Sequence, residues 1–98
     1  MTSKQRAALR GMANTMPTIL HIGINGITKE VCQQAWDALE ARELIKVGLQ
    51  DGAPMTTREA CGELCERVHA EPVQCIGKRF VIYRPARKPV IDLDELVK

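Results

Sequence analysis

Residues 18–29, TILHIGINGITK, carry the clearest structural signal in this chain. The first five, residues 18–22, are mostly β-branched or aliphatic, which predicts a short strand. The two glycines of GINGIT (residues 23–28) predict a turn, and Thr28 is a good N-cap. A helix over residues 29–41 then follows, with side chains at core spacing that include Val31, Cys32, Ala35, Trp36 and Leu39. This segment therefore predicts a strand, a turn and a helix.

The segments on either side extend this pattern to an αβαβαββ order. Two further helices, each begun by a capping box, are predicted over residues 3–13 and 57–70. Three further strands are predicted at residues 44–49, 73–76 and 80–83, the last two joined as a hairpin. Helical crossovers favour parallel pairing among the first three strands, and the hairpin adds an antiparallel one. We expect an α+β fold, equally an α/β sandwich, with a mixed four-stranded sheet covered by helices.

The length of 98 residues suits one domain with one core. We expect residues 1–85 to form this domain and residues 86–98 to form a tail, with one helical turn near residues 93–97. No apolar run approaches the length of a membrane span, and the N-terminus lacks the apolar stretch of a secretory signal. We therefore expect an intracellular protein in the cytoplasm, and we also expect it to be a monomer.

The charges are arranged in blocks along the chain. Residues 1–29 carry a net charge of +4 and residues 72–91 carry +5, both without any acid, whereas residues 30–71 carry −5 and the end carries −2. If folding brings the two basic segments together, the molecule has one positive and one negative face, and the positive face suits a polyanion. Judged from charge alone, ordinary solvated surface explains such blocks equally well.

The cysteines and histidines do not form a recognisable catalytic or metal site. Cys61, Cys65 and His69 share one side of a helix, but structural zinc sites collect ligands from turns and separate elements. We expect both cysteines to be core residues, since a free cysteine packs as a small hydrophobe. His21 is expected to be half-buried in its strand and His69 to face solvent. We predict no metal, no cofactor and no enzymatic activity, because no nucleophile or carboxylate stands at motif spacing.

The glycine loop offers its backbone rather than its side chains. Glycine allows a positive φ and a close approach, and the first N–H groups of the following helix favour an anion. The chain has neither GxxxxGK[ST] nor GxGxxG, so the usual triphosphate and dinucleotide loops are excluded. What remains is GxxG, the pattern by which KH modules clamp single-stranded nucleic acid. A plain turn between strand and helix explains these residues as well.

Four segments carry a wider resemblance: LRGMA (9–13), GINGIT (23–28), ELIKV (43–47) and QCIGKRFVIYRP (74–85). In order and spacing they resemble the CRM domain family, the YhbY-like RNA-binding proteins, over residues 4–85. The resemblance implies the fold of the C-terminal domain of translation initiation factor 3 and RNA contact through the GxxG loop. It also implies the bacterial stand-alone form, which is linked to assembly of the large ribosomal subunit, whereas plant relatives assist group II intron splicing. Ile24 and Asn14 depart from the family, which often has a polar or basic residue and a histidine there.

We therefore predict an RNA-binding protein whose target is ribosomal RNA or a precursor of the large subunit, with ribosomal or assembly proteins as further partners. The predicted RNA-binding residues are Lys4, Arg6, Arg10, Gly23, Ile24, Asn25, Gly26, Thr28, Lys29, Lys46, Arg79 and Arg84. Lys4 and Arg10 are expected to lie near the loop. Stacking of bases on an aromatic sheet is disfavoured, because the chain has one Trp, one Phe and one Tyr, and Trp36 is expected in the core. The alternative is a protein-interaction module that docks through the acidic residues 30–71.

Overall fold

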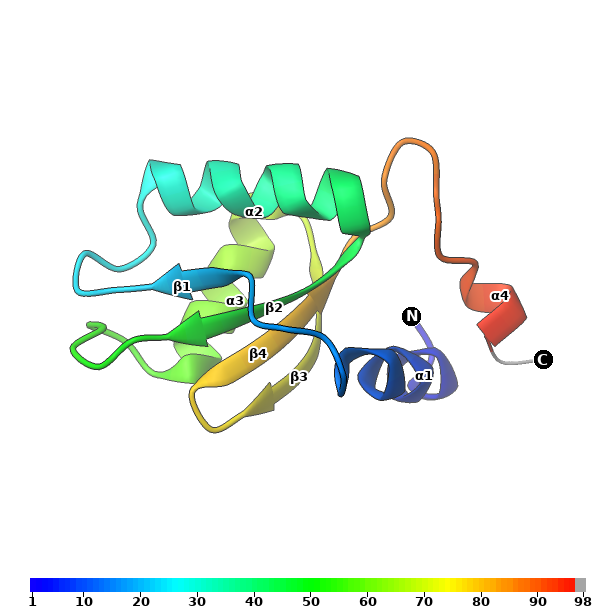
Figure 1. Cartoon of the computed structure of the whole chain (residues 1–98), viewed down its shortest axis with the longest axis horizontal. Coiled ribbons are helices and arrows are strands. Elements are labelled where there is room, and N and C mark those ends of the chain that lie inside the picture. Colours follow the sequence, from blue (N-terminus) through cyan, green and yellow to red (C-terminus); the bar gives the residue numbers. More distant parts are fainter. Residues whose placement is uncertain (97–98) are drawn as a thin grey trace.

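The computed structural model describes residues 1–96 and confirms the predicted α+β fold and element order (Figure 1). Within these residues the elements are α1 (Ser3–Ala13), β1 (Leu20–Ile22), α2 (Lys29–Arg42), β2 (Leu44–Leu49), α3 (Thr57–Val68), β3 (Glu71–Ile76), β4 (Arg79–Tyr83) and α4 (Leu93–Leu96). The helical turn expected near residues 93–97 is α4, and residue 97 lies outside the described residues.

The three longer helices begin where the sequence supplies a capping hydroxyl. The residue before each helix is a threonine whose side chain accepts a backbone N–H from three positions on: Thr2, Thr28 and Thr56. In α1 and α3 the side chains of Gln5 and Glu59 accept the threonine N–H in return, completing two capping boxes. Each cap is worth about 1 kcal/mol, so these short signals suffice to fix the helix starts.

The order of strands in the sheet is β1-β2-β4-β3, which differs from the predicted pairing. β1 and β2 are parallel as expected, but β4 lies between β2 and β3 and is antiparallel to both. The predicted direct pairing of the second and third strands is therefore wrong. The reason is burial: four of the five residues of β4 are buried, whereas β3 exposes most of its residues and carries Pro72. Proline and exposed side chains suit an edge strand, and a strand that is mostly apolar and buried suits the centre.

Each face of the sheet has its own hydrophobic core. On one face α2 and α3 pack on the sheet, with Leu39, Ile45 and Phe80 among the buried side chains. On the other face the core is smaller and lies under α1, whose Leu9 packs with buried side chains of β2, β3 and β4. Ile91 packs at the margin of this second core, so the chain beyond residue 85 covers part of the α1 face.

The prediction that Cys61 and Cys65 are core residues is confirmed. Both side chains are buried, at 2% and 6% exposure, in the cluster under α2 and α3. Their spacing of four residues places them on the side of α3 that faces the sheet.

Two aromatic side chains lie elsewhere than predicted. Trp36 is 40% exposed, so its assignment to the core is wrong. It follows Ala35, which is buried, and one position along a helix turns a side chain by about 100° away from the core direction. His21 is exposed rather than half-buried, because it points to the face opposite α2 and α3, and α1 does not cover that part of the sheet. His69 is exposed at the end of α3, as predicted.

A buried carboxylate fixes the segment that follows β4. Glu43 has no exposed surface and joins α2 to β2 with a φ of +66°. Its side-chain oxygens accept the backbone N–H groups of Ala86 at 2.7 Å and of Val90 and Ile91 at 2.6 Å each. Burial raises the pKa of Glu43, but these three hydrogen bonds outweigh it and hold the pKa below its ordinary value. The carboxylate therefore anchors residues 86–91 to the sheet.

Candidate nucleic-acid interface

The glycine loop, residues 23–26, has a tight turn and an exposed tip. The N–H of Gly26 donates to the carbonyl of Gly23 at 3.0 Å, and Gly26 has a φ of +71°. Ile24 is 76% exposed and Asn25 is also exposed. Because residues 24 and 25 are the exposed residues of the turn, a ligand that approaches the loop would contact them first.

At both glycines of the loop, neighbouring side chains leave little room for a Cβ atom. A Cβ on Gly23 would lie 2.9 Å from Oε1 of Gln50. A Cβ on Gly26 would lie 3.1 Å from Cε of Met55, and Gly26 is buried. Gly26 therefore faces the neighbouring loop rather than open solvent, and any contact with a ligand at this position is made by backbone atoms at the tip.

The helix start beside the loop carries mixed charge. Thr28 caps α2 by accepting the N–H of Val31 at 3.2 Å, and Lys29 is exposed in the first turn. Glu30 is exposed in the same turn, and the sequence-based prediction of an anion site did not include it. A carboxylate at a helix N-terminus takes the place that an anion would occupy and offsets the charge of the lysine. The loop alone is therefore a weak site for phosphate.

A more favourable site for phosphate lies on the open part of the sheet. α1 covers only part of its face, and the remainder forms a hollow of about 330 Å³ that we call the sheet hollow. Its lining includes Asn14 from the end of α1, Lys46, Gln74, Ile76 and Arg79. The lining residues contain three cations and no carboxylate. Charge of one sign in a concave site attracts anions more strongly than the same charge spread over a flat surface.

The cations of the sheet hollow differ in their burial and in the hydrogen bonds that they already form. Lys46 is half-buried and belongs to the central part of β2. Arg79 is exposed, and its Nε donates to Oγ1 of Thr18 at 3.1 Å, which leaves the rest of the guanidinium to face solvent. Lys78 hydrogen-bonds to Asp51, and this hydrogen bond lowers the pKa of the aspartate. Lys46 and Arg79 are therefore the cations best placed to meet a phosphate.

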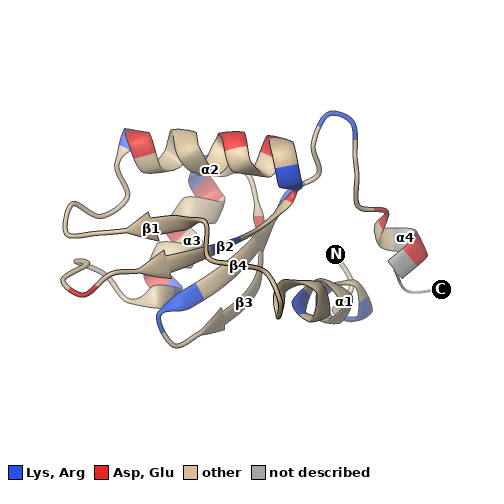
Figure 2. Ribbon diagram, in the orientation of Figure 1, with Lys and Arg blue, Asp and Glu red and all other residues tan. Residues whose placement is uncertain are grey.

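The cations of α1 extend this surface in the direction away from the glycine loop (Figure 2). Lys4 and Arg10 are exposed, and the helix has no acid. Arg6 already uses one of its donors within the protein, since its Nε donates to the carbonyl of Pro72 at 3.3 Å. Figure 1 shows α1 and the loop after β1 at opposite ends of the sheet, so the expectation that Lys4 and Arg10 lie near the loop is wrong.

Arg84 is the one predicted RNA-binding residue whose charged group faces inward. It is 8% exposed, and its guanidinium donates to the carbonyl of Val68 at 2.9 Å and to Glu40 at 2.7 Å. The same group lies over the ring of Trp36, 3.9 Å from its centre. Its position in the YRP segment therefore has a structural explanation, and we do not keep it in the interface.

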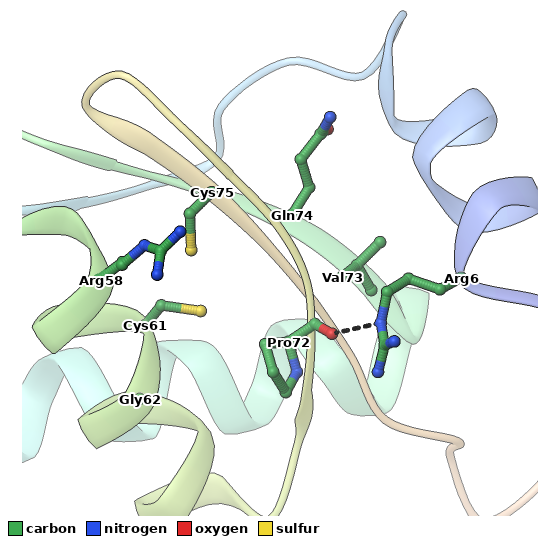
Figure 3. Close-up of a pocket in the computed structure, with 8 residues that line it drawn as sticks. All are labelled: Arg6, Arg58, Cys61, Gly62, Pro72, Val73, Gln74 and Cys75. Carbon is green, nitrogen blue, oxygen red and sulfur yellow. Dashed lines mark hydrogen bonds between the residues drawn. The ribbon is translucent and has the colours of Figure 1, made fainter. Parts of the chain in front are cut away.

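Another hollow, of about 440 Å³, lies between α1, α3 and β3 (Figure 3). The sulfur atoms of Cys61 and Cys75 lie along it, next to Arg58. A hydrogen bond with Cys65, together with burial, raises the pKa of the Cys61 thiol, and burial first of all raises the pKa of Cys75 to about 11. Across the described part of the chain, no cluster of three or more His, Cys, Asp or Glu side chains is arranged to hold a metal.

Comparison with known proteins shows which family the chain belongs to. The family model of the CRS1 / YhbY (CRM) domain matches residues 1–84. The chain belongs to this family. The resemblance inferred from the four sequence segments is thereby confirmed. In residues 1–96, no helix is both long and apolar enough to cross a membrane.

Individual relatives agree with this assignment. The chain is 31% identical over 88 residues to the "Probable RNA-binding protein YqeI" of Bacillus subtilis, covering 90% of this chain and 92% of the relative. It is 31% identical over 93 residues to an "RNA-binding protein" of Haemophilus influenzae, covering 95% and 94%. The solution structure of the hypothetical protein SAV1595 from Staphylococcus aureus superposes with a TM-score of 0.77 at 38% identity, covering 90% of this chain and 92% of that one.

Proposed function

We propose that this protein binds structured RNA through the side of the sheet that carries α1. The observation that carries the proposal is the sheet hollow, which is lined by both Lys46 and Arg79 and has no carboxylate in its lining. The exposed cations of α1, Lys4 and Arg10, continue the same surface. The tip of the glycine loop makes a second, weaker contact. The names of the relatives, which describe RNA-binding proteins, support the choice of RNA as the polyanion.

Recognition on this surface depends on the phosphate backbone and on shape. Lysine and arginine contact phosphates without reading sequence, and each neutralised phosphate releases counterions. The one aromatic residue that borders the sheet hollow is Phe80, which is 1% exposed and packs in the core under α2 and α3. Base stacking on the sheet, as in modules with aromatic strands, is therefore not part of the proposal.

We further propose that the RNA is ribosomal RNA in a precursor of the large subunit, that the protein acts in the cytoplasm as a monomer, and that it has no catalytic role. The ribosomal target rests on the family resemblance. Crosslinking in cells followed by sequencing of the bound RNA tests it. Enrichment of one region of large-subunit ribosomal RNA is the expected result, and an even distribution over messenger RNA would contradict the ribosomal target.

The surface itself is tested by two charge-matched double variants. Lys46→Gln with Arg79→Gln removes two cations from the sheet hollow, and Arg42→Gln with Arg58→Gln removes two exposed cations from α2 and α3. We expect the first pair to weaken RNA binding and to reduce the slope of log K against log salt by about 1 for each phosphate that is no longer neutralised. The second pair should leave the slope unchanged. Equal slopes in both variants would contradict the proposed surface.

Docking of a protein through residues 30–71 remains the alternative. Its acidic side chains Glu30, Asp37 and Glu66 are exposed on α2 and α3, the helices on the opposite face of the sheet from α1 (Figure 2). Charge reversal at Asp37 and Glu66 would impair a protein partner's binding while leaving RNA binding intact, which separates the two functions in a pull-down from cell extract.

A further inference from the structure

A hollow of about 330 Å³ opens between α2 and α3, away from the sheet hollow. We call it the Trp36 hollow, and its lining comprises Lys29, Cys32, Gln33, Trp36, Arg67 and Val68. Its volume is at the lower end of the range for small-molecule sites, about 300–1,000 Å³. It combines the chain's one tryptophan with two cations, and no carboxylate is among its lining residues.

The tryptophan is held in place before any ligand arrives. The guanidinium of Arg84 lies 3.9 Å from the centre of the indole, and His69 meets the ring edge-on with ring centres 6.3 Å apart. Arg84 is itself fixed by Glu40 and by the carbonyl of Val68. Trp36 as a whole nevertheless keeps 40% of its surface exposed. A large aromatic surface that is fixed and exposed loses little entropy when another ring stacks on it.

The two cations stand at the end of the hollow that adjoins the glycine loop. Lys29 is exposed in the first turn of α2, a few residues after that loop, and is absent from the ion pairs found within residues 1–96. Arg67 donates from Nη1 to the carbonyl of Ile27 at 3.2 Å, which ties α3 to the end of the loop. Its Nη2 lies 3.5 Å from Glu63, which balances part of its charge, and Glu30 in the first turn of α2 offsets part of the charge of Lys29, so a phosphate contact here needs both cations.

This arrangement matches one ligand chemistry, a planar aromatic group joined to a phosphate. Aromatic side chains stack on unpaired bases, and lysine or arginine contacts the adjoining phosphate. We propose that the Trp36 hollow holds one unpaired nucleotide of the bound RNA, with the base on Trp36 and the phosphate beside Lys29 and Arg67. The inference rests on the proposed function. It gives the glycine loop a second role, because an RNA strand that contacts the loop tip can continue past Lys29 into the Trp36 hollow.

The single tryptophan makes a direct measurement possible. Its intrinsic fluorescence is followed while the protein is titrated with a 12-nucleotide adenine-rich single strand, with heparin and with adenosine monophosphate. The single strand should quench the fluorescence, because a stacked base contacts the indole, whereas heparin has no base and should bind without quenching. Quenching by adenosine monophosphate alone, with none by the single strand, would overturn the assignment to RNA in favour of a free nucleotide.

Two substitutions at the ring provide the matched comparison. Trp36→Leu removes the stacking surface and should weaken single-strand binding by about 5- to 100-fold, whereas Trp36→Phe keeps an aromatic face and should retain most of the affinity. Binding by these variants is measured by anisotropy of labelled RNA, and circular dichroism confirms that they fold. Heparin binding serves as an internal control and should be equal in both variants and the parent.

The outcomes separate this inference from the proposed function. If RNA binding depends on Lys46 and Arg79, but the fluorescence of Trp36 does not change and Trp36→Leu binds as tightly as the parent, the inference is wrong and the proposed function stands. In that case the hollow is open to a protein segment instead. If the parent protein does not bind RNA, the proposed function itself has failed, whether or not it binds heparin.

Discussion

Replacing Glu43 with glutamine removes one charge and changes one side-chain oxygen to an amide nitrogen at a fully buried position. The carboxylate receives three backbone N–H groups, one on Oε2 from Ala86 and two on Oε1 from Val90 and Ile91. If the glutamine oxygen takes the place of Oε1, it still accepts the N–H groups of Val90 and Ile91. The amide group then takes the place of Oε2 and faces the N–H of Ala86, so that two donors face each other. The variant therefore loses one hydrogen bond and weakens two.

The expected cost follows from these contacts. A hydrogen bond to a charged group contributes about 1.5–3 kcal/mol, and a buried donor left without a partner costs about 1–3 kcal/mol. With partial relaxation of residues 86–91, we expect the free energy of unfolding to fall by about 2–4 kcal/mol, out of a total of about 5–15 kcal/mol for a domain of this kind. The melting temperature should drop by about 10 °C or more. The backbone conformation of residue 43 is equally strained in both proteins, so strain does not enter the comparison.

The assay is chemical denaturation at pH 7, with Glu66→Gln as the control, because Glu66 is an exposed glutamate on α3. The control should change the free energy of unfolding by less than about 0.5 kcal/mol. The pH dependence adds a second check. Because the pKa of Glu43 is held below its ordinary value of 4.5, the stabilisation is complete above that value and is lost as the pH falls through the folded pKa. Stability of Glu43→Gln within about 0.5 kcal/mol of the parent at pH 7 would refute this account of the buried carboxylate.

Three further outcomes are expected. Gly26→Ala should lower the free energy of unfolding by about 1–2 kcal/mol in denaturant titrations, since an alanine at a φ of +71° is strained and its Cβ presses on Met55. Ile24→Lys should tighten RNA binding at low salt and Ile24→Asp should weaken it, because residue 24 is 76% exposed at the loop tip; equal affinities would show that the tip does not reach the RNA. Metal analysis should find no stoichiometric zinc with Cys61 and Cys65, and a chelator should leave the melting temperature unchanged; a large drop would restore the metal hypothesis.

Features that depend on neighbouring residues could be predicted from the sequence. The three threonine caps indicated the helix starts, and the alternation of apolar segments with turns indicated the element order. The burial of Cys61 and Cys65 also followed from helical spacing. Such signals act over a few residues, so their energies do not depend on where the rest of the chain lies.

Which distant segments meet depends on the packing of the whole chain. β4 lies in the centre of the sheet because more of its residues are buried than those of β3, and its pairing with β2 joins two segments that are far apart in sequence. The same long-range packing turned Arg84 inward onto Trp36 and Glu40, and placed α1 at the far end of the sheet from the glycine loop. A charged residue binds whatever the fold brings beside it, a carboxylate or a ligand, and residue type alone does not specify which. The sequence therefore showed which residues are cations, and the fold determined whether each charge faces solvent or the interior.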